Sequence, residues 1–401
     1  MKTIDIITRD MHQLHGANKV TEKLILGKDY FAANGLKLRY VISQDGVIDC
    51  NNYKSNLGKQ LNTVHYKRKR RIIELLKKLP VYKTYFIQRI IVKGEFEKNK
   101  KICQYVDTID EKPDFIIYQD PFAAIYYLKK TGDLTKSLFI SHADTDPLEQ
   151  LFLGRASLLG TQTETYIREK LKKFFDHVGA VVTICTASKN YMKDVYGKIC
   201  PCIINGIEDM IIIAKRKYSD NDSKIHIAIV ASIQYRKGQD IAVEALSKLP
   251  DDKKKKLIIH IIGGGEGSGR LTEQVKNLDL IDNVILHGPI LDVENYLPMM
   301  DAFLLPSRAD TVPIAIIEAM RAGLPIFATD VGEIPEMISG CGEVIEATVE
   351  SVQDLYSRIV EERFDLVKLG ENSREKYLTE FQLKSMINKY SNVVNEILSE
   401  I

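Results

Sequence analysis

The sequence has little net charge, few cysteines and no long apolar run. Its 56 Lys and Arg residues nearly balance 54 Asp and Glu residues, for a formal net charge of +2, so the overall balance does not support wholesale binding to nucleic acid. No stretch approaches the ~18 uninterrupted apolar residues of a membrane-spanning helix. The first ten residues are broken by Asp5, Arg9 and Asp10, unlike a signal peptide. We therefore expect a cytoplasmic protein.

The cysteines are too few and too scattered to indicate a metal site or a disulfide framework. They show no zinc-like spacing, and Cys200 and Cys202 are too close together for an ordinary disulfide. We expect reduced and mostly buried thiols, and no bound metal. The six cysteines are Cys50, Cys103, Cys185, Cys200, Cys202 and Cys341.

The second half of the chain has the pattern of an α/β domain. From about Lys224 onward, continuously apolar runs alternate with helix-like segments, as expected of a parallel sheet covered on both faces. The sequence therefore predicts a doubly wound domain. The predicted strands contain KIHIAIVAS, KLIIHIIGGG, NVILHGP, AFLLPS and PIFATD.

The first half repeats this pattern with longer insertions, and 401 residues suffice for two domains. We predict an N-terminal Rossmann-like domain over 1–215 and a C-terminal one over 216–401, with a linker near 208–224. An amphipathic helix at about 382–401 could pack back on the first domain. Two such domains place a cleft between the carboxyl ends of their sheets, where ligands bind in these folds.

Residues 61–100 form a strongly basic segment. They contain twelve Lys or Arg and three Glu, a local balance of +9, with apolar residues interleaved among the bases. A basic amphipathic helix on an anionic membrane has this pattern. The alternative is a solvated face with an ordinary core stripe. The apolar residues are Ile72, Ile73, Leu75, Leu76, Leu79, Tyr82, Tyr85 and Phe86.

Chemistry-bearing residues follow several strands of the second half. Arg236 and Lys237 precede a helix start at Gly238, an arrangement that suits a pyrophosphate, although two exposed bases in a turn is an equal alternative. The glycine-rich stretch 263–270 follows a middle strand and is only weak evidence for a dinucleotide site. The stretch 288–290 is either a plain turn or a backbone wall for a base.

The stretch SRADTVPIAIIEAMRAGLP places a carboxylate inside an apolar helix, where an unpaired charge is costly. Pro313 is well placed as the first helical residue, with an anion site at the amides around 312–314. Glu318 could accept hydrogen bonds from vicinal hydroxyls, and Asp310 could do so for a second polyol. Alternatively, Glu318 reaches solvent or caps a neighbouring amide.

Together, these residues resemble the signature of retaining glycosyltransferases of family 4, which have the GT-B fold. The family pattern is a Glu, seven residues, then Glu-Ala-Met, a Gly-Leu-Pro strand and a Gly-x-Ile-Pro-Glu turn. Here Asp310 stands at the first position, Glu318 at the second and 332–336 at the turn. The resemblance also includes RKGQD, IINGI and, in the first half, HGANKV.

The resemblance implies a role for each matching residue. Glu318 would bind the ribose of a nucleotide sugar, Asp310 the transferred sugar, and Arg236 with Lys237 the diphosphate, so that no metal or other cofactor is needed. His142 would be aimed at the donor sugar, although a purely structural histidine is the alternative. The remaining donor-binding residues would be Gly16, Gly288, Ile290, Thr311, Val312, Pro313 and Ile314.

The sequence departs from the family at two positions. Asp310 is one carbon shorter than the usual Glu, which affects the expected preference for the donor sugar. The family's arginine five residues before the lysine is Ser232 here, which leaves Arg236 as its replacement.

The reaction implied is retaining transfer from a nucleoside-diphosphate sugar, by preference a UDP-sugar, to a saccharide acceptor. The basic segment suggests an acceptor at the inner face of the membrane, either a lipid-linked saccharide such as a polyprenyl-diphosphate saccharide or a cell-surface polysaccharide precursor. A protein or a soluble glycan is the alternative acceptor. The alternatives are a non-catalytic GT-B subunit that binds a glycan or a partner, and a sugar-nucleotide epimerase. A nicotinamide-dependent dehydrogenase is disfavoured because MHQLHGANK lacks the glycine fingerprint.

Overall fold

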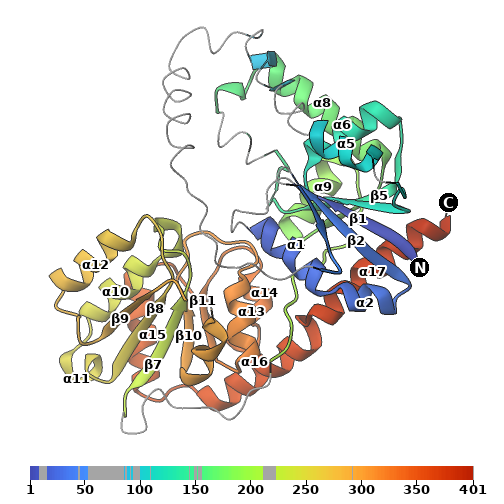
Figure 1. Cartoon of the computed structure of the whole chain (residues 1–401). Helices are drawn as coiled ribbons and strands as arrows, with labels where there is room; N and C mark the ends of the chain where they lie inside the picture. The colour runs from blue at the N-terminus through green and yellow to red at the C-terminus, as the bar shows by residue number, and fades with distance from the viewer. Residues whose placement is uncertain are drawn as a thin grey trace. The chain divides into compact units, whose positions relative to one another are not determined.

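The chain forms two compact units in the computed structural model (Figure 1). Unit 1 contains Met1–Ile204 and Met386–Ile401, and unit 2 contains Asn205–Ser385. The sequence predicted the boundary at 215/216. The structure describes residues 1–8, 16–43, 46–52, 85, 88–90, 92–93, 100–108, 110–143, 145–148, 151, 156–210, 223–290 and 292–400. Most of the basic segment 61–100 therefore lies outside the described residues.

Unit 1 is built on a six-stranded sheet in the order β3-β2-β1-β4-β5-β6. All neighbouring strands are parallel except β2 and β3, which are antiparallel. The sequence did not predict β3; the connection before it is too short for the crossover that a parallel partner requires. The strands are β1 (Lys2–Ile7), β2 (Leu36–Ser43), β3 (Gly46–Asp49), β4 (Phe115–Tyr118), β5 (Leu134–Ser141) and β6 (Val178–Thr183).

Helices pack against this sheet, and aromatic side chains form part of the core between them. Phe139 on β5 packs edge-on against Phe174 and Phe175 of α8, with ring centroids 5.3 and 5.9 Å apart. Helix α6 shows clear local signals, since the Asp120 carboxylate accepts the Phe122 amide at 2.9 Å and Pro121 starts the helix. The helices are α1 (Gly16–Leu26), α2 (Lys28–Ala33), α5 (Lys100–Thr108), α6 (Pro121–Thr131), η2 (Ala156–Leu158), α8 (Gln162–His177) and α9 (Thr186–Tyr196).

Unit 2 contains a six-stranded, wholly parallel sheet in the order β12-β11-β10-β7-β8-β9. The chain builds outward from β7 on one side and from β10 on the other, so the strand order reverses between them. Ligands bind at such a point in open α/β sheets. The strands are β7 (Ile225–Val230), β8 (Leu257–Ile262), β9 (Val284–Gly288), β10 (Ala302–Leu305), β11 (Ile326–Thr329) and β12 (Gly342–Ile345).

Three unit 2 strands, β8, β10 and β11, are buried along their whole length, as their continuous apolar runs predict. All six residues of β8 and all four of β10 and of β11 are buried, and α10 and α15 contribute to the same core. The helices are η3 (Tyr235–Lys237), α10 (Gln239–Ser247), α11 (Asp251–Lys254), α12 (Ser268–Asn277), η4 (Val293–Asn295), η5 (Leu297–Met299), α13 (Ile314–Arg321), α14 (Ile334–Ile338), α15 (Val349–Val360) and α16 (Leu366–Glu380).

The last helix, α17 (Leu383–Glu400, red in Figure 1), begins in unit 2 and continues in unit 1. In unit 1 the Asn34 side-chain amide donates to Asn388 Oδ1 at 2.8 Å, and Asn395 donates to the Asn34 carbonyl oxygen at 3.2 Å. The final helix thus belongs largely to the unit formed by the start of the chain. Among the described residues, no helix combines the length and apolarity needed to cross a membrane.

Candidate functional site

The candidate site lies at the carboxyl ends of β7 and β10, where the unit 2 strand order reverses. The two strands pair in parallel, with Ile227 opposite Ala302 and Ala228 opposite Phe303. The loops that follow them therefore leave the same edge of the sheet side by side. One loop contains the 3₁₀ turn η3 with the predicted cations, and the other contains the predicted carboxylate.

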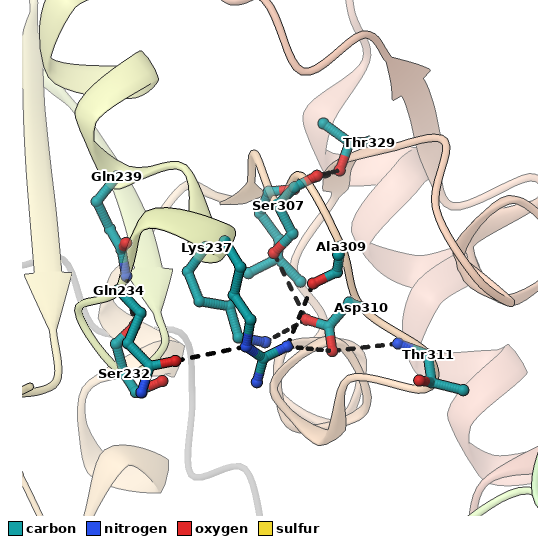
Figure 2. Close-up of polar contacts among 11 residues, drawn as sticks. Ser232, Gln234, Lys237, Gln239, Ser307, Ala309, Asp310, Thr311 and Thr329 are labelled. Atoms are coloured by element: carbon teal, nitrogen blue, oxygen red, sulfur yellow. Dashed lines mark hydrogen bonds and ion pairs between the residues drawn. The ribbon is translucent and has the colours of Figure 1, made fainter. Parts of the chain in front are cut away.

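Lys237 and Asp310 form an ion pair across these loops (Figure 2). Both side chains are only 11% exposed, so the pair is shielded from water. The Asp310 carboxylate also accepts the Ser307 hydroxyl at 3.5 Å and the Thr311 amide at 3.3 Å. A second cation, Arg236, lies with Nη1 3.9 Å from Asp310 Oδ1. The structure thus brings three of the predicted catalytic residues together.

Arg236 is the more accessible of the two cations. Its side chain is 52% exposed, and its guanidinium donates to the Ala309 carbonyl oxygen at 3.2 Å and to Gln234 Oε1 at 3.4 Å. Ser232 stands where the family has an arginine. Its backbone carbonyl oxygen accepts a hydrogen bond from the Gln239 side-chain amide at 3.0 Å. Arg236 therefore holds a positive charge beside Asp310 that Ser232 cannot supply.

Two glycines allow the backbones around the ion pair to touch. Gly238 has φ +70°, and a Cβ atom there would lie 1.8 Å from the Pro306 carbonyl oxygen. Gly332 has φ +60°, and its Cβ would lie 2.3 Å from the Asp310 carbonyl oxygen and 2.5 Å from that of Thr311. L-residues with side chains rarely adopt such φ values. These glycines therefore set how closely the loops pack around Lys237 and Asp310.

Helix α13 begins one residue later than predicted. Pro313 is its N-cap, with an extended ψ of 115°, so Ile314 rather than Pro313 is the first helical residue. Pro313 and Val312 are buried, whereas Thr311 and Ile314 are half-buried. A proline at the N-cap supplies no amide, so any anion contact at this end comes from its neighbours.

Glu318 sits half-buried on α13 among buried neighbours. Within the described part of the chain its carboxylate makes no hydrogen bond or ion pair, which leaves no support for the alternative that it caps a neighbouring amide. A partly buried carboxylate without a protein partner favours an external hydrogen-bond donor. A pair of sugar hydroxyls would meet that need.

The predicted base-binding stretch 288–290 packs against the glycine-rich loop after β8. The Gly263 amide donates to the Gly288 carbonyl oxygen at 2.9 Å, and the Ile233 amide donates to the Gly264 carbonyl oxygen at 3.1 Å. A Cβ at Gly263, where φ is +146°, would lie 2.0 Å from the Ala231 carbonyl oxygen. The glycines after β8 thus join three loops at the same edge of the sheet. Ile290 is half-buried beside them.

Gly16 and His142 belong to unit 1 and are described separately from the residues above. Gly16 is the first residue of α1, and His142 directly follows β5. Neither ring nitrogen of His142 has a hydrogen-bonding partner among the described residues. Burial lowers the pKa of His142 to about 4, so its imidazole is neutral at pH 7.

Three histidines that the sequence analysis did not single out form a row across β7, β8 and β9 of the unit 2 sheet. His226 Nδ1 lies 2.8 Å from His260 Nε2, and His260 Nδ1 lies 2.9 Å from His287 Nε2. Burial, followed by the neighbouring histidines, lowers the pKa of His260 to about 3, and burial lowers that of His287 as well. His260 and His287 are therefore neutral at pH 7, and the row links the interior of the sheet to the end of β9.

Arg308 is a second residue that the sequence did not single out. Its guanidinium pairs with both oxygens of Asp240 at 2.8 Å, close to the cation-bearing turn. Arg308 and Asp240 lie in the motifs SRAD and KGQD, both of which the sequence analysis quoted. The spacing of these motifs gave no indication that the two residues are in contact. No group of three or more His, Cys, Asp or Glu within the described ranges is arranged to hold a metal ion.

Comparisons with known proteins identify a family match and relatives in sequence and in fold. Residues 211–376 match the protein family described as Glycosyl transferases group 1. Over 190 residues the chain is 28% identical to N-acetyl-alpha-D-glucosaminyl L-malate synthase of Bacillus anthracis, covering 46% of this chain and 49% of that protein. Over 205 residues it is 22% identical to the O-antigen biosynthesis glycosyltransferase WclY of Escherichia coli, covering 50% and 56%. The alignments thus span about half of each relative.

The similarity in fold to solved structures extends over the whole chain. The crystal structure of Anabaena HepE in complex with UDP superposes with a TM-score of 0.63 at 14% sequence identity, covering 100% of both chains. Together with the two parallel-sheet units, this confirms the predicted GT-B fold class. The match to the glycosyl transferases group 1 family covers residues 211–376, which contain the Lys237–Asp310 pair.

Proposed function

We propose that this chain is a retaining glycosyltransferase that moves a sugar from a nucleoside-diphosphate sugar to a saccharide acceptor. The observation that carries the proposal is the meeting of Lys237, Arg236 and Asp310 at the reversal point of the unit 2 sheet. Two cations there suit a diphosphate, and a carboxylate beside them suits sugar hydroxyls. Because the similarly folded HepE was crystallised with UDP, we favour a UDP-sugar as the donor.

In the proposed reaction, the bond between the anomeric carbon and the leaving phosphate oxygen breaks. A bond from the same carbon to an acceptor hydroxyl oxygen forms on the same face, and the hydroxyl proton passes to the leaving phosphate. Lys237 and Arg236 stabilise the charge that develops on this phosphate, so no metal or other cofactor is assigned a role. Asp310 holds the transferred sugar.

The other predicted residues act through binding in this proposal. Glu318 accepts hydrogen bonds from the ribose hydroxyls, since its carboxylate has no partner among the described residues. His142 is neutral at pH 7 and can hydrogen-bond a donor sugar without adding charge. Gly288 and Ile290 contact the base of the donor. Gly16 allows the backbone to approach the phosphates closely, and the stretch 311–314 contacts the rest of the donor.

The acceptor proposed is a lipid-linked saccharide or another precursor of a cell-surface polysaccharide. The similarity to an O-antigen biosynthesis glycosyltransferase supports this class. The basic segment 61–100 would hold the cytoplasmic protein at the anionic inner face of the membrane. Because another relative is named for L-malate, small hydroxy acids belong in the acceptor screen.

The test is a thermal-shift screen of nucleotide sugars, followed by product analysis of the best binder with each acceptor class. A transferase yields a glycosylated acceptor whose anomeric configuration, measured by NMR, equals that of the donor. An epimerase converts the nucleotide sugar without an acceptor, and a non-catalytic subunit shows neither donor binding nor hydrolysis. Either of these last two results overturns the proposal.

A substitution at Lys237 distinguishes a role in the transfer reaction from a role in folding. Lys237→Ala should reduce transfer at least a hundredfold while circular dichroism stays unchanged, because it removes a cation from the leaving phosphate. Lys276→Ala is the matched control, since Lys276 is an exposed lysine on α12 of the same unit. Unchanged turnover in Lys237→Ala contradicts the assigned role.

A further inference from the structure

Arg308 connects the loop that carries Asp310 to the turn that carries the two cations. Its guanidinium pairs with Asp240 through Nη1 and Nη2, both at 2.8 Å, and Nη1 also donates to the Tyr235 carbonyl oxygen at 2.6 Å. The guanidinium carbon lies 4.0 Å from the centre of the Tyr235 ring. Arg308 thereby contacts η3 at its first residue and α10 in its first turn.

Backbone bonds extend the same connection. The Arg308 amide donates to the Arg236 carbonyl oxygen at 2.8 Å, and the Ala309 amide reaches the same oxygen at 3.3 Å. In return, Arg236 Nη1 donates to the Ala309 carbonyl oxygen at 3.2 Å. Arg308 and Ala309, which precede Asp310, are therefore hydrogen-bonded to Arg236, which precedes Lys237.

The turn η3 needs such external support. It is a single 3₁₀ turn that ends in the left-handed Gly238, so it has few hydrogen bonds of its own. Tyr235 is 71% exposed and does not anchor the turn by entering the core. The bidentate pairing of Arg308 and its stacking on Tyr235 fix the turn from one side, which a flexible ammonium group could not do.

We propose that Arg308 is a positioning residue that orients η3 so that Arg236 and Lys237 bind the diphosphate of the donor. This inference rests on the proposed function. Arg308 acts through the turn, because its guanidinium is already engaged by Asp240 and by the Tyr235 carbonyl oxygen. Its loss therefore weakens binding of the diphosphate and leaves binding of the nucleoside part unchanged.

A second ion pair in unit 2 supplies a matched control. Arg358 pairs bidentately with Glu343 at 2.8 and 2.6 Å and lies over the Phe364 ring at 5.2 Å. Its side chain is 22% exposed and that of Glu343 is 36% exposed, compared with 25% and 36% for Arg308 and Asp240. Glu343 lies on β12, the outer strand of the sheet, two strands from β10. Arg358→Ala thus removes a similar pair away from the site.

The experiment compares Arg308→Ala, Arg308→Lys, Asp240→Asn and Arg358→Ala with the unchanged protein. Calorimetric titration measures the Kd for UDP, with GDP and ADP run alongside, and ligand-observed NMR measures the Kd for the matching nucleoside. We expect the three variants at Arg308 and Asp240 to bind the diphosphate about tenfold more weakly, with unchanged nucleoside binding. Arg358→Ala should bind both as the unchanged protein does and should lower Tm by a similar amount.

The outcomes separate this inference from the function on which it rests. If the unchanged protein binds none of the nucleoside diphosphates, the proposed function fails and the role of Arg308 fails with it. If it binds one and the Arg308 and Asp240 variants bind equally well, only the positioning role is overturned. Equal weakening of diphosphate and nucleoside binding also overturns that role, because it shows a general structural effect. Arg308→Lys and Asp240→Asn keep these outcomes measurable if Arg308→Ala does not fold.

Discussion

Lys237 and Asp310 are 73 positions apart in the chain and form an ion pair that is almost closed to water. Each partner was assigned a separate ligand group, the lysine a phosphate and the aspartate a sugar hydroxyl. The two side chains pair with each other in the structure. A donor that binds here must therefore exchange this contact for its own, and the length of the Asp310 side chain affects how that exchange occurs.

We predict that Asp310→Glu changes the preference among UDP-sugars. The added methylene moves the carboxylate outward from Ser307 and Thr311 and toward the sugar, so the kcat/KM ratio between two donor sugars should shift by about tenfold. The measurement is kcat/KM for a panel of UDP-sugars with one acceptor. Asp282→Glu, at an exposed position in the same unit, is the control and should leave every ratio unchanged. Identical donor profiles for Asp310→Glu and the unchanged protein contradict the assignment.

Glu318→Gln should reduce the preference for a ribose over a deoxyribose nucleotide. The unchanged protein should bind UDP more tightly than 2′-deoxy-UDP, because the carboxylate accepts hydrogen bonds from both ribose hydroxyls; the variant should bind UDP about tenfold more weakly. Its Tm should not fall, since the carboxylate has no partner among the described residues. Titration calorimetry with both nucleotides measures the difference. A variant that keeps the full ribose preference would show that Glu318 serves only as a solvent-facing helix residue.

Gly238→Ala should destabilise the protein by about 3 kcal/mol or more. The new methyl group would lie 1.8 Å from the Pro306 carbonyl oxygen, at a backbone φ of +70° that alanine adopts only under strain. Gly269→Ala is the control, because a Cβ there meets nothing within 4 Å and the residue lies in helix α12. The control should be neutral or slightly stabilising. Chemical denaturation of both variants measures the free energies of unfolding, and equal values would contradict the close approach.

Stability should fall as pH drops below about 6.5, partly because of His260. The unfolded chain binds a proton at this histidine near its usual pKa of 6.5, whereas the folded chain does so only near 3. Between these values the unfolded state holds the extra proton, so acid favours unfolding and the loss is complete near pH 3. The Tm of His260→Asn should therefore depend less on pH between 6.5 and 3. His177→Asn, at an exposed histidine of α8, should keep the slope of the unchanged protein.

Much of the fold could be predicted because buried parallel strands leave a direct pattern in the sequence. The apolar runs of β8, β10 and β11 are buried along their whole length, as predicted. The antiparallel β3 was missed because its four residues carry no such run. The start of α13 was misplaced by one residue because proline fixes φ but leaves ψ free to stay extended.

The site was predictable where motif residues follow strand ends, and not where contacts join distant motifs. Lys237 and Asp310 were both named from the sequence, but their pairing depends on β7 lying beside β10. The Arg308–Asp240 pair joins residues 68 positions apart and has no local signature. The histidine row was hidden for a related reason, since each histidine stands singly in an apolar strand.

The division of the chain has a consequence for its synthesis. Residues 386–401 complete unit 1, but they are translated only after all of unit 2. Domains fold as they emerge from the ribosome, so the unit that starts first should be completed last. A ribosome stalled after residue 385 would carry every residue of unit 2. Unit 1 would still lack residues 386–401, which contact the surface around Asn34.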